Sequence, residues 1–423
     1  MKSTFLIAAT SSGCGKTTLS LGLIRALARA GKRVQPFKCG PDYIDTQFQT
    51  IAAGHEAINL DLFMASENHV RSLFSHYSAN ADVSVVEGVM GMFDGFDGMR
   101  GSSADLARML DIPVVLLINA TSTAYSVAAT IYGFTHFYPD IKVVGVIFNR
   151  VASPNHYSFL KKACEDVGVE CFGYMKRCEA LQTPSRHLGL TLSTAKDMNR
   201  FIDIAAEEAG KDVDLDRLIS ATLMADRPKE ELIIPIMRDL TVAVARDEAF
   251  SFIYPANLKS FGKIRYFSPL HDEHLPEADL VYLPGGYPEL YASCLAANHI
   301  MRRDIKSFAE AGGHILAECG GLIYLCERID GHEMCGIFPM NATMSESKLH
   351  LGYRTVAFQN ITLRGHEFHY SHITDPSPEL SIAQQTNAKG REVDTHVYRY
   401  KNVIAGYTHL YWAESDLLKL WTI

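Results

Sequence analysis

Short apolar runs alternate with amphipathic stretches through the first half of the chain. The first run, residues 5–9, predicts a buried strand, and it precedes a stretch whose Leu19, Leu23 and Leu27 fall on one face of a helix. The same pattern predicts strands at residues 33–38, 83–86, 112–118, 143–148 and 170–174, and helices at residues 122–136 and 155–167. Alternating strands and helices form parallel sheets with helices on both faces, so we expect a doubly wound α/β domain.

A change of pattern separates the two halves of the chain. Residues 193–224 predict mostly helix, and the charged residues 226–240, with Pro228 and Pro235, are typical of a linker. Beyond them, strands are expected at residues 241–245, 264–267, 279–283 and 314–318, and helices at residues 289–310 and 322–327. The sequence therefore predicts two α/β domains, residues 1–225 and 241–423.

Composition and charge narrow the functional class. Of the 423 residues, 47% are hydrophobic and 21% are charged, as in globular proteins. The formal net charge of -8, without long runs of like charge, argues against a nucleic-acid or membrane partner. Nine irregularly spaced cysteines indicate a reducing compartment, and no apolar run reaches the roughly 18 residues of a membrane span. We expect a cytoplasmic enzyme that acts on small molecules, and a homodimer is compatible with the sequence.

The strand-to-helix junction TSSGCGKTT, residues 10–18, has the chemistry of a phosphate-binding loop. In such a loop, backbone N–H groups converge on a phosphate, Lys16 reaches the outer phosphates, and Thr17 can bind magnesium. The strict pattern has glycine where this chain has Thr10, and Gly13 could supply the missing freedom. An ordinary glycine-rich connection is the alternative. The residues expected at a nucleoside triphosphate are Ser12, Gly13, Cys14, Gly15, Lys16, Thr17 and Thr18.

Polar residues follow two further strands of the first half. Lys38 ends one strand, Asp42 and Asp45 follow it, and Glu87 closes the next apolar run. Open α/β sheets place their chemistry at strand ends, where a carboxylate such as Glu87 suits magnesium. Asp94 lies in a glycine-rich loop that could cover a substrate. Solvated turns are the alternative for the aspartates, as is a water-facing position for the glutamate.

In the second half, the segment AECGG places Cys319 between a strand and an apolar helix. Such a turn exposes the sulfur at a helix N-terminus, which favours the thiolate of a nucleophile. The backbone N–H of Gly320, with one from the turn of Gly286 and Tyr287, could form an oxyanion hole. An inert buried cysteine is the alternative.

A cysteine nucleophile needs a base, and His409 is the strongest candidate among the 17 histidines. It follows an apolar run and would lie at a strand end, near the sheet edge that carries Cys319. The rival histidines are His366, His369 and His372 in RGHEFHYSH, whose spacing fits a metal site or an ordinary solvated strand face.

Eight segments, taken in order, resemble one enzyme family. They are TSSGCGKTT, PFKCGPDYID, VVEGVMGMFDG, ARDEAFSFIY, LPGGYPE, AECGG, RGHEFHYS and GYTHLYW. The first half is similar to ATP-dependent carboxylate ligases of the dethiobiotin synthetase type, and the second half to class I glutamine amidotransferases. Together they resemble the cobyrinic acid a,c-diamide synthases. The resemblance implies glutamine-fed amidation of the a and c acetate groups of a corrinoid with ATP and Mg2+, in cobalamin biosynthesis.

The resemblance also implies a role for each candidate residue. Cys319, activated by His409, would release ammonia from glutamine, and the ammonia would attack an acyl phosphate made from ATP and a substrate carboxylate. Lys16 and Lys38 would stabilise the phosphates, Thr17 and Glu87 would serve magnesium, and Asp42 and Asp94 would act at the substrate or the metal.

Two departures from the family pattern leave alternatives open. Ala317 stands where many class I amidotransferases have glycine, and Tyr411 stands where most have the glutamate of a catalytic triad. What orients His409 is therefore open. Hydrogenobyrinic acid and nickel sirohydrochlorin are alternative substrates, and the later amidations of a cobyric acid synthase are an alternative reaction. A partitioning-type P-loop ATPase is an alternative class, but it would have no use for Cys319.

Overall fold

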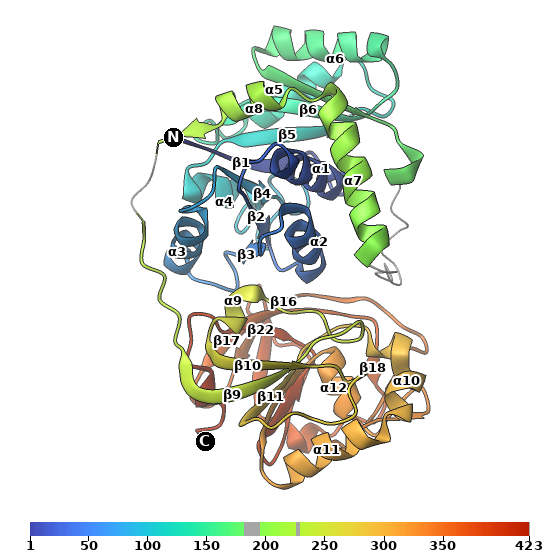
Figure 1. Ribbon diagram of the computed structural model, residues 1–423. Helices are drawn as coiled ribbons and strands as arrows, with labels where there is room; N and C mark the ends of the chain where they lie inside the picture. Colours follow the sequence, from blue (N-terminus) through green and yellow to red (C-terminus); the bar gives the residue numbers. More distant parts are fainter. Residues whose placement is uncertain (182–194, 226–228, 423) are drawn as a thin grey trace. The chain divides into compact units, whose positions relative to one another are not determined.

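The computed structural model describes residues 1–181, 195–225 and 229–422. The chain divides into two compact units (Figure 1). Met1–Leu62 and Ser66–Leu232 form the first unit, and Phe63–Ala65 and Ile233–Ile423 form the second. No helix in the described ranges is long and apolar enough to cross a membrane.

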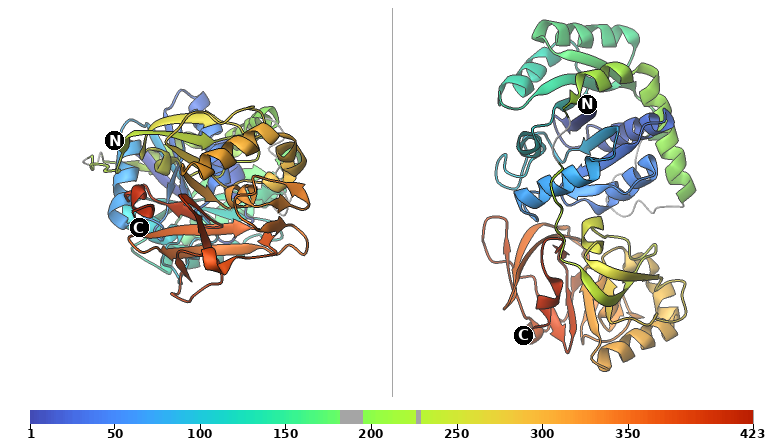
Figure 2. Two further views of the ribbon diagram at one scale, coloured as in Figure 1. Left: turned by 90° about the horizontal axis from the view of Figure 1, so that it is seen from below. Right: turned by 60° about the vertical axis from the view of Figure 1, so that its left-hand side comes forward.

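A parallel sheet forms the centre of the first unit, in the order β3-β2-β4-β1-β5-β6-β7, and the short β8 pairs antiparallel with β1. Its strands are β1 Lys2–Ala9, β2 Val34–Cys39, β3 Ile58–Leu60, β4 Val83–Glu87, β5 Val114–Asn119, β6 Val143–Val151, β7 Glu170–Lys176 and β8 Leu223–Met224. Helices flank both faces of the sheet (Figure 2). The chain leaves the neighbouring strands β1 and β4 in opposite directions, toward β2 and β5, so the carboxyl ends of β1 and β4 form the topological switch point where ligands bind in such folds.

Several helices of the first unit begin at a residue whose side chain caps the first turn. The helices of this unit are α1 Lys16–Arg29, α2 Tyr43–Ala53, α3 Glu67–Ser78, α4 Ser103–Leu110, α5 Val127–His136, α6 Pro154–Val167, α7 Ala195–Asp212 and α8 Leu215–Ala221, with the 3-10 turn η1 Glu179–Leu181. Ser66, Ser102 and Ser153 accept hydrogen bonds from the first turns of α3, α4 and α6. The core lies between β1 and the pair α1 and α7, which approach closely at Gly22, where a Cβ would lie 2.6 Å from Ala205 O.

Three sheets build the second unit. A mainly parallel sheet has the order β10-β9-β11-β12-β21-β20, with only β20 antiparallel, and two four-stranded sheets have the orders β14-β13-β15-β18 and β19-β16-β17-β22. The strands are β9 Met237–Ala245, β10 Phe261–Phe267, β11 Leu280–Leu283, β12 His314–Glu318, β13 Arg328–Ile329, β14 His332–Glu333, β15 Asn341–Thr343, β16 His350–Ala357, β17 Thr362–His369, β18 His372–Ile373, β19 Gln384–Asn387, β20 Val397–Tyr400, β21 Val403–Gly406 and β22 His409–Tyr411. The helices and 3-10 turns are α9 Pro255–Leu258, η2 Pro288–Tyr291, α10 Ala292–Ala297, α11 His299–Glu310, α12 Gly320–Leu325, η3 Pro378–Leu380 and η4 Leu417–Leu420.

The structure differs from the sequence-based expectation in several elements. The helix predicted over residues 289–310 is divided into η2, α10 and α11, because Asn298 adopts φ -80° and ψ 66° and its side chain caps α11. The helix predicted from Ser122 begins only at Val127, and α2, β3 and α3 were not predicted. The helical prediction for residues 193–224 fails at β8, and its first two residues lie outside the described chain, as do residues 226–228 of the predicted linker. The strand β9 begins at Met237, inside that linker.

Candidate active site

The predicted phosphate-binding loop connects β1 to α1. Gly13 and Gly15 have φ angles of 76° and 96°, which L side chains rarely adopt. A Cβ at Gly15 would lie 2.2 Å from Asn149 Nδ2, and this amide donates a hydrogen bond of 2.8 Å to Cys14 O. The loop is thereby fixed against the end of β6. Within the described chain no side chain caps the N-terminus of α1, where backbone N–H groups suit an anion.

Lys16 opens α1, and its amino group folds back over the loop. Lys16 Nζ donates to Ser11 O at 3.4 Å and also to Met90 O, in the loop that follows β4. Burial, and next the positive charge of Lys38, lower the pKa of Lys16. The side chain therefore links the phosphate-binding loop to the loop that carries Asp94.

Four side chains from four different elements meet at the ends of β2 and β4. Lys38 Nζ lies 2.7 Å from Asp45 Oδ2 and 2.8 Å from Glu87 Oε1. Thr17 Oγ1 donates to Glu87 Oε1 at 2.8 Å and to Asp45 Oδ2 at 3.3 Å. Burial alone would lower the pKa of Lys38, but the carboxylates of Asp45 and Glu87 raise it above its usual value. The lysine is therefore a buried cation held between two carboxylates.

The sequence placed Thr17, Lys38 and Glu87 near one sheet edge, and the structure brings these three side chains together. Asp45, considered only as a neighbour of Lys38, is a full member of the cluster, and Gln49 Nε2 donates to Glu87 Oε2 at 2.7 Å. Asp45 and Gln49 are four residues apart on α2 and so share one face of it. The helix α2 was not predicted, so the sequence alone did not indicate that Asp45 and Gln49 lie on the same side of one element.

Asp42 and Asp94 both form hydrogen bonds with backbone N–H groups close to them in the chain. Asp42 is the N-cap of α2, and its Oδ1 accepts from Ile44 N at 2.9 Å and from Asp45 N at 2.8 Å. Asp94 Oδ2 accepts from Gly91 N at 3.0 Å and so closes the loop after β4. Roles for these two aspartates at a substrate or a metal stay predictions.

The oxygens of this cluster fit a magnesium ion. Thr17, Asp45 and Glu87 offer hydroxyl and carboxylate oxygens, the ligands that Mg2+ prefers. Lys38 already holds the same two carboxylates, so a divalent cation would have to share them with an ammonium group. Thr17 and Glu87 are the residues that would hold the ion, with Asp45 beside them.

Removal of the buried cation gives a stability prediction. We expect Lys38→Met to lower the free energy of unfolding of the first unit by about 3–5 kcal/mol, because it leaves two buried carboxylates without a counter-charge. Lys142→Met is the matched control, since Lys142 and Asp111 are both 69% exposed and such pairs contribute about 1 kcal/mol or less. Urea unfolding followed by far-UV circular dichroism measures the change. Both tryptophans, Trp412 and Trp421, lie in the second unit, so their fluorescence should be unaffected.

Cys319 occupies the turn between β12 and α12, as predicted. Its φ of 48° and ψ of -103° are a strained conformation for a residue other than glycine. Cys319 N donates to Gly406 O at 2.8 Å, and Sγ lies 3.8 Å from Phe368 O. Burial, and next the negative charge of Glu289, raise the pKa of the Cys319 thiol. The sequence predicted a thiolate, but the resting structure favours the thiol, because Cys319 is only 5% exposed and lies among acidic groups.

His409 begins β22 and lies opposite His366 on the neighbouring strand β17. Cys319 also borders β17, through the approach of its sulfur to Phe368 O. It is joined to β21 as well, because its N–H bonds to Gly406, three residues before His409. Cys319 and His409 therefore both lie beside β17 and near the end of β21.

The His409 imidazole is buried and packs on Gly285, where a Cβ would lie 2.1 Å from Cε1. Burial, and next the neighbouring His366 and His369, lower the pKa of His409 well below its usual value. The ring is therefore neutral at physiological pH. A neutral imidazole can accept a proton, as a general base must.

The predicted oxyanion-hole residues come from two turns that touch. A Cβ at Gly320 would lie 3.0 Å from Gly286 N and 2.8 Å from Pro288 Cδ. Gly320 opens α12, and Tyr287 directly precedes η2. The two turns therefore lie in contact, and a shared oxyanion hole built from their backbone N–H groups stays a prediction.

The sequence reasoning missed Glu318, the residue before the candidate nucleophile. Glu318 Oε1 accepts from Leu410 N at 2.8 Å, and Oε2 accepts from Tyr282 Oη at 2.7 Å. Burial raises the pKa of Glu318 to about 8. The carboxyl group ties the strand of Cys319 to the residue after His409, so it helps to hold this candidate base in a chain that has Tyr411 in place of a triad glutamate. An acidic residue at the end of an apolar run was the signal in the sequence.

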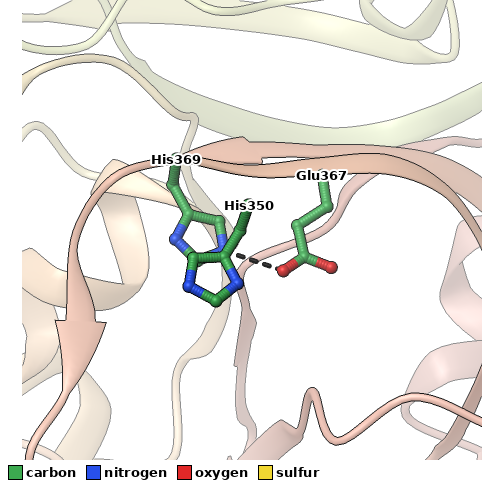
Figure 3. A group of neighbouring side chains, drawn as sticks. All are labelled: His350, Glu367 and His369. Carbon is green, nitrogen blue, oxygen red and sulfur yellow. Dashed lines mark hydrogen bonds and ion pairs between the residues drawn. The ribbon is translucent and has the colours of Figure 1, made fainter. Parts of the chain in front are cut away.

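The histidine-rich segment 364–372 contributes a buried hydrogen-bond network (Figure 3). His369 Nε2 lies 2.8 Å from Glu367 Oε1, and Arg354 Nε donates to Glu367 Oε2 at 2.5 Å. His350 stacks on His369 with ring centroids 4.8 Å apart, which brings ligand atoms of His350, Glu367 and His369 within 4.8 Å of one another. The carboxylate is already paired with the Arg354 cation, so we interpret this group as a network that fixes β17 and not as a metal site. His372, the third histidine of the predicted spacing, lies outside the group.

A methyl group added at Gly285 would collide with the His409 ring, which gives a second prediction. We expect Gly285→Ala to lower glutamine-dependent activity by about 100-fold, because a methyl group would displace the His409 ring. Activity with ammonium as nitrogen source should persist. Gly133→Ala is the control, since a Cβ there meets no described atom within 4 Å. Steady-state rates with each nitrogen source measure the effect, and equal losses with both sources would contradict the placement of His409.

The comparisons with known proteins agree with the two units. Residues 5–190 match the CobQ/CobB/MinD/ParA nucleotide binding domain, and residues 241–417 match the CobB/CobQ-like glutamine amidotransferase domain. The solved structure of chloroplast FtsY from Physcomitrella patens aligns over 48% of this chain and 65% of its own at 14% identity. Its TM-score of 0.31 is too low to indicate a shared fold.

Fold and site together define a nucleotide-binding P-loop domain joined to a glutamine amidotransferase domain. The cobyrinate a,c-diamide synthase of Salmonella typhimurium is 38% identical, with 99% of this chain and 97% of the relative covered. That of Streptococcus sanguinis is 39% identical over 99% and 98% of the two chains. The hydrogenobyrinate a,c-diamide synthase of Brucella abortus is 37% identical over 96% and 98%. The chain belongs to the a,c-diamide synthase family, which confirms the resemblance inferred from the eight segments.

Proposed function

We propose that the protein amidates the a and c acetate groups of cobyrinic acid with ATP and glutamine. The observation that carries this proposal is that one chain holds both the cluster of Thr17, Lys38, Asp45 and Glu87 beside the phosphate-binding loop and the strand-to-helix turn of Cys319 near His409. The description of the nucleotide-binding family also names MinD and ParA, which are partitioning ATPases, so this domain alone does not distinguish a ligase from a switch ATPase. A switch ATPase has no use for a glutamine-hydrolysing unit, so the second unit favours the ligase.

In the second unit, His409 accepts the proton of the Cys319 thiol, and the sulfur attacks the side-chain amide carbon of glutamine. The N–H groups of Gly320 and of the turn of Gly286 and Tyr287 stabilise the resulting oxyanion. His409 returns the proton to the leaving nitrogen, so ammonia departs and a thioester remains. Water then hydrolyses the thioester to glutamate and restores the thiol.

In the first unit, an acetate carboxylate of the substrate attacks the γ-phosphate of ATP, and ADP leaves. Lys16 and Lys38 stabilise the negative charge of the transferred phosphate. A magnesium ion bound by Thr17 and Glu87 would neutralise further phosphate charge. Ammonia then attacks the acyl phosphate, and phosphate leaves as the amide forms. We further propose that Asp42 and Asp94 contact the substrate or the metal.

The relatives differ in the substrate for which they are named, and the two substrates differ in their central metal. Relatives named for cobyrinate are 37% to 39% identical, and those named for hydrogenobyrinate are 37% identical. Hydrogenobyrinic acid is therefore the second candidate, and it differs from the first by the absence of cobalt.

Mass spectrometry tests the proposal. Purified protein is incubated with ATP, magnesium and glutamine, and with cobyrinic acid, hydrogenobyrinic acid or nickel sirohydrochlorin. We expect two acid-to-amide conversions on cobyrinic acid, which stop at the diamide. Conversion of hydrogenobyrinic acid in preference would select the second candidate. ATP hydrolysis without amide formation on any of the three would contradict the proposal.

A further inference from the structure

Glu289 lies directly beside the candidate nucleophile turn. It belongs to η2, the 3-10 turn that follows Gly286 and Tyr287. Its neighbour Pro288 packs on the residue after the nucleophile, because a Cβ at Gly320 would lie 2.8 Å from Pro288 Cδ. Glu289 thus begins on the same backbone turn that carries the predicted oxyanion hole.

The Glu289 carboxylate is partly buried and has no counter-charge. Among the described residues no cation pairs with it, and its own backbone N–H is the only hydrogen-bond donor to it. Burial, opposed by that N–H and reinforced by the charge of Asp330, raises the pKa of Glu289 to about 7. A carboxylate withdrawn from water without a cation is unfavourable, so such a group is typical of a site that a charged ligand completes.

The other acidic groups around Cys319 are already satisfied. Glu367 is held by Arg354 and His369, and Glu318 by Tyr282 and a backbone N–H. Only Glu289, of the three glutamates whose charge acts on the Cys319 thiol, lacks a partner in the described chain. A cation carried by a ligand would supply the partner that Glu289 lacks.

We propose that the Glu289 carboxylate binds the α-ammonium group of glutamine and thereby sets the donor amide against Cys319. This inference rests on the proposed use of glutamine. Glu289 is then the residue that recognises glutamine as the nitrogen donor. The α-ammonium is the only cation of the donor, and it is separated from the amide carbon by a short chain that can bridge neighbouring turns. A charged hydrogen bond to this group distinguishes glutamine from amides without an amino group.

The same contact couples donor binding to activation of the nucleophile. While glutamine is absent, the negative charge of Glu289 opposes formation of a thiolate at Cys319. An ammonium group bound to Glu289 offsets that charge, so the thiol loses its proton to His409 more readily once the donor is seated. Unproductive reactions of the free thiol are thereby reduced.

Covalent labelling of Cys319 tests this inference without ATP or corrinoid. 6-Diazo-5-oxonorleucine carries the α-ammonium group of glutamine and alkylates the thiol with loss of N2, whereas iodoacetamide alkylates it and carries no ammonium group. We expect Glu289→Gln to slow labelling by the diazo compound about 10- to 100-fold, the effect of losing a charged hydrogen bond, and to leave labelling by iodoacetamide as fast or faster. Mass spectrometry of the labelled peptide measures both rates.

Two control variants keep the result interpretable. Glu273→Gln removes an exposed carboxylate of the same unit and should change neither rate. Glu289→Asp keeps the charge on a shorter side chain and should fall between the wild type and Glu289→Gln. Equal slowing with both reagents would show a structural role and overturn the inference. A wild-type protein that reacts with iodoacetamide but not with the diazo compound would instead contradict the proposed glutamine chemistry.

Discussion

Cys319→Ala should abolish glutamine-dependent amidation while amidation with ammonium salts continues near the wild-type rate. In the proposed mechanism the Cys319 sulfur attacks the glutamine amide, and no other described thiol lies at this turn to replace it. Loss of a nucleophile lowers such activities by at least about a thousandfold. The proposal assigns the ATP-dependent step to residues of the first unit, which the substitution does not change. Amide formation measured by mass spectrometry with each nitrogen source gives the ratio.

Cys326→Ala is the matched control for Cys319→Ala. Cys326 is also buried and lies at the end of α12, one helix length from the turn. Its loss should leave glutamine-dependent activity within about threefold of the wild type, because it removes one buried atom and no chemical group of the site. A folded Cys319→Ala protein that lost activity with ammonium as well would show that the two units do not divide the chemistry.

The order of strands and helices in the first unit could be predicted because its signals are local. The apolar runs at β1, β4 and β5 and the glycines of the phosphate-binding loop each stand out within a few residues. The helices α2 and α3 were not predicted, although their buried residues recur at helical spacing. The salt bridge between Lys38 and Asp45 depends on α2, so the cluster could be predicted only in part.

The second unit shows a different limit of sequence reasoning. The strand, turn and helix around Cys319 were predicted from a short apolar run and two glycines. The raised pKa of the thiol was not predicted, because it depends first on burial in the folded unit and then on Glu289 and Glu367, which lie 30 and 48 residues away in the chain. Pairing across β17 and β22, which brings His409 beside His366, is likewise a contact between distant segments.

Lys16→Ala should lower amidation by at least about 100-fold with glutamine and with ammonium alike. Removal of one positive donor from developing charge typically lowers a rate by about 10²–10³. The amino group of Lys16 folds onto Ser11 O and Met90 O, at the predicted phosphate-binding loop. Since both nitrogen sources require the acyl phosphate, both should fail together. Steady-state rates at saturating ATP measure the loss.

Labelling of Cys319 by the diazo reagent should remain unchanged in Lys16→Ala, because the thiol belongs to the other unit. Lys32→Ala is the matched control, since Lys32 is exposed just beyond the end of α1 and should not alter either reaction. A Lys16→Ala protein that lost only glutamine-dependent activity would place Lys16 in ammonia supply instead of phosphate transfer. Joint loss of the amide products with intact labelling would assign the phosphate step to the first unit and the nitrogen-releasing step to the second.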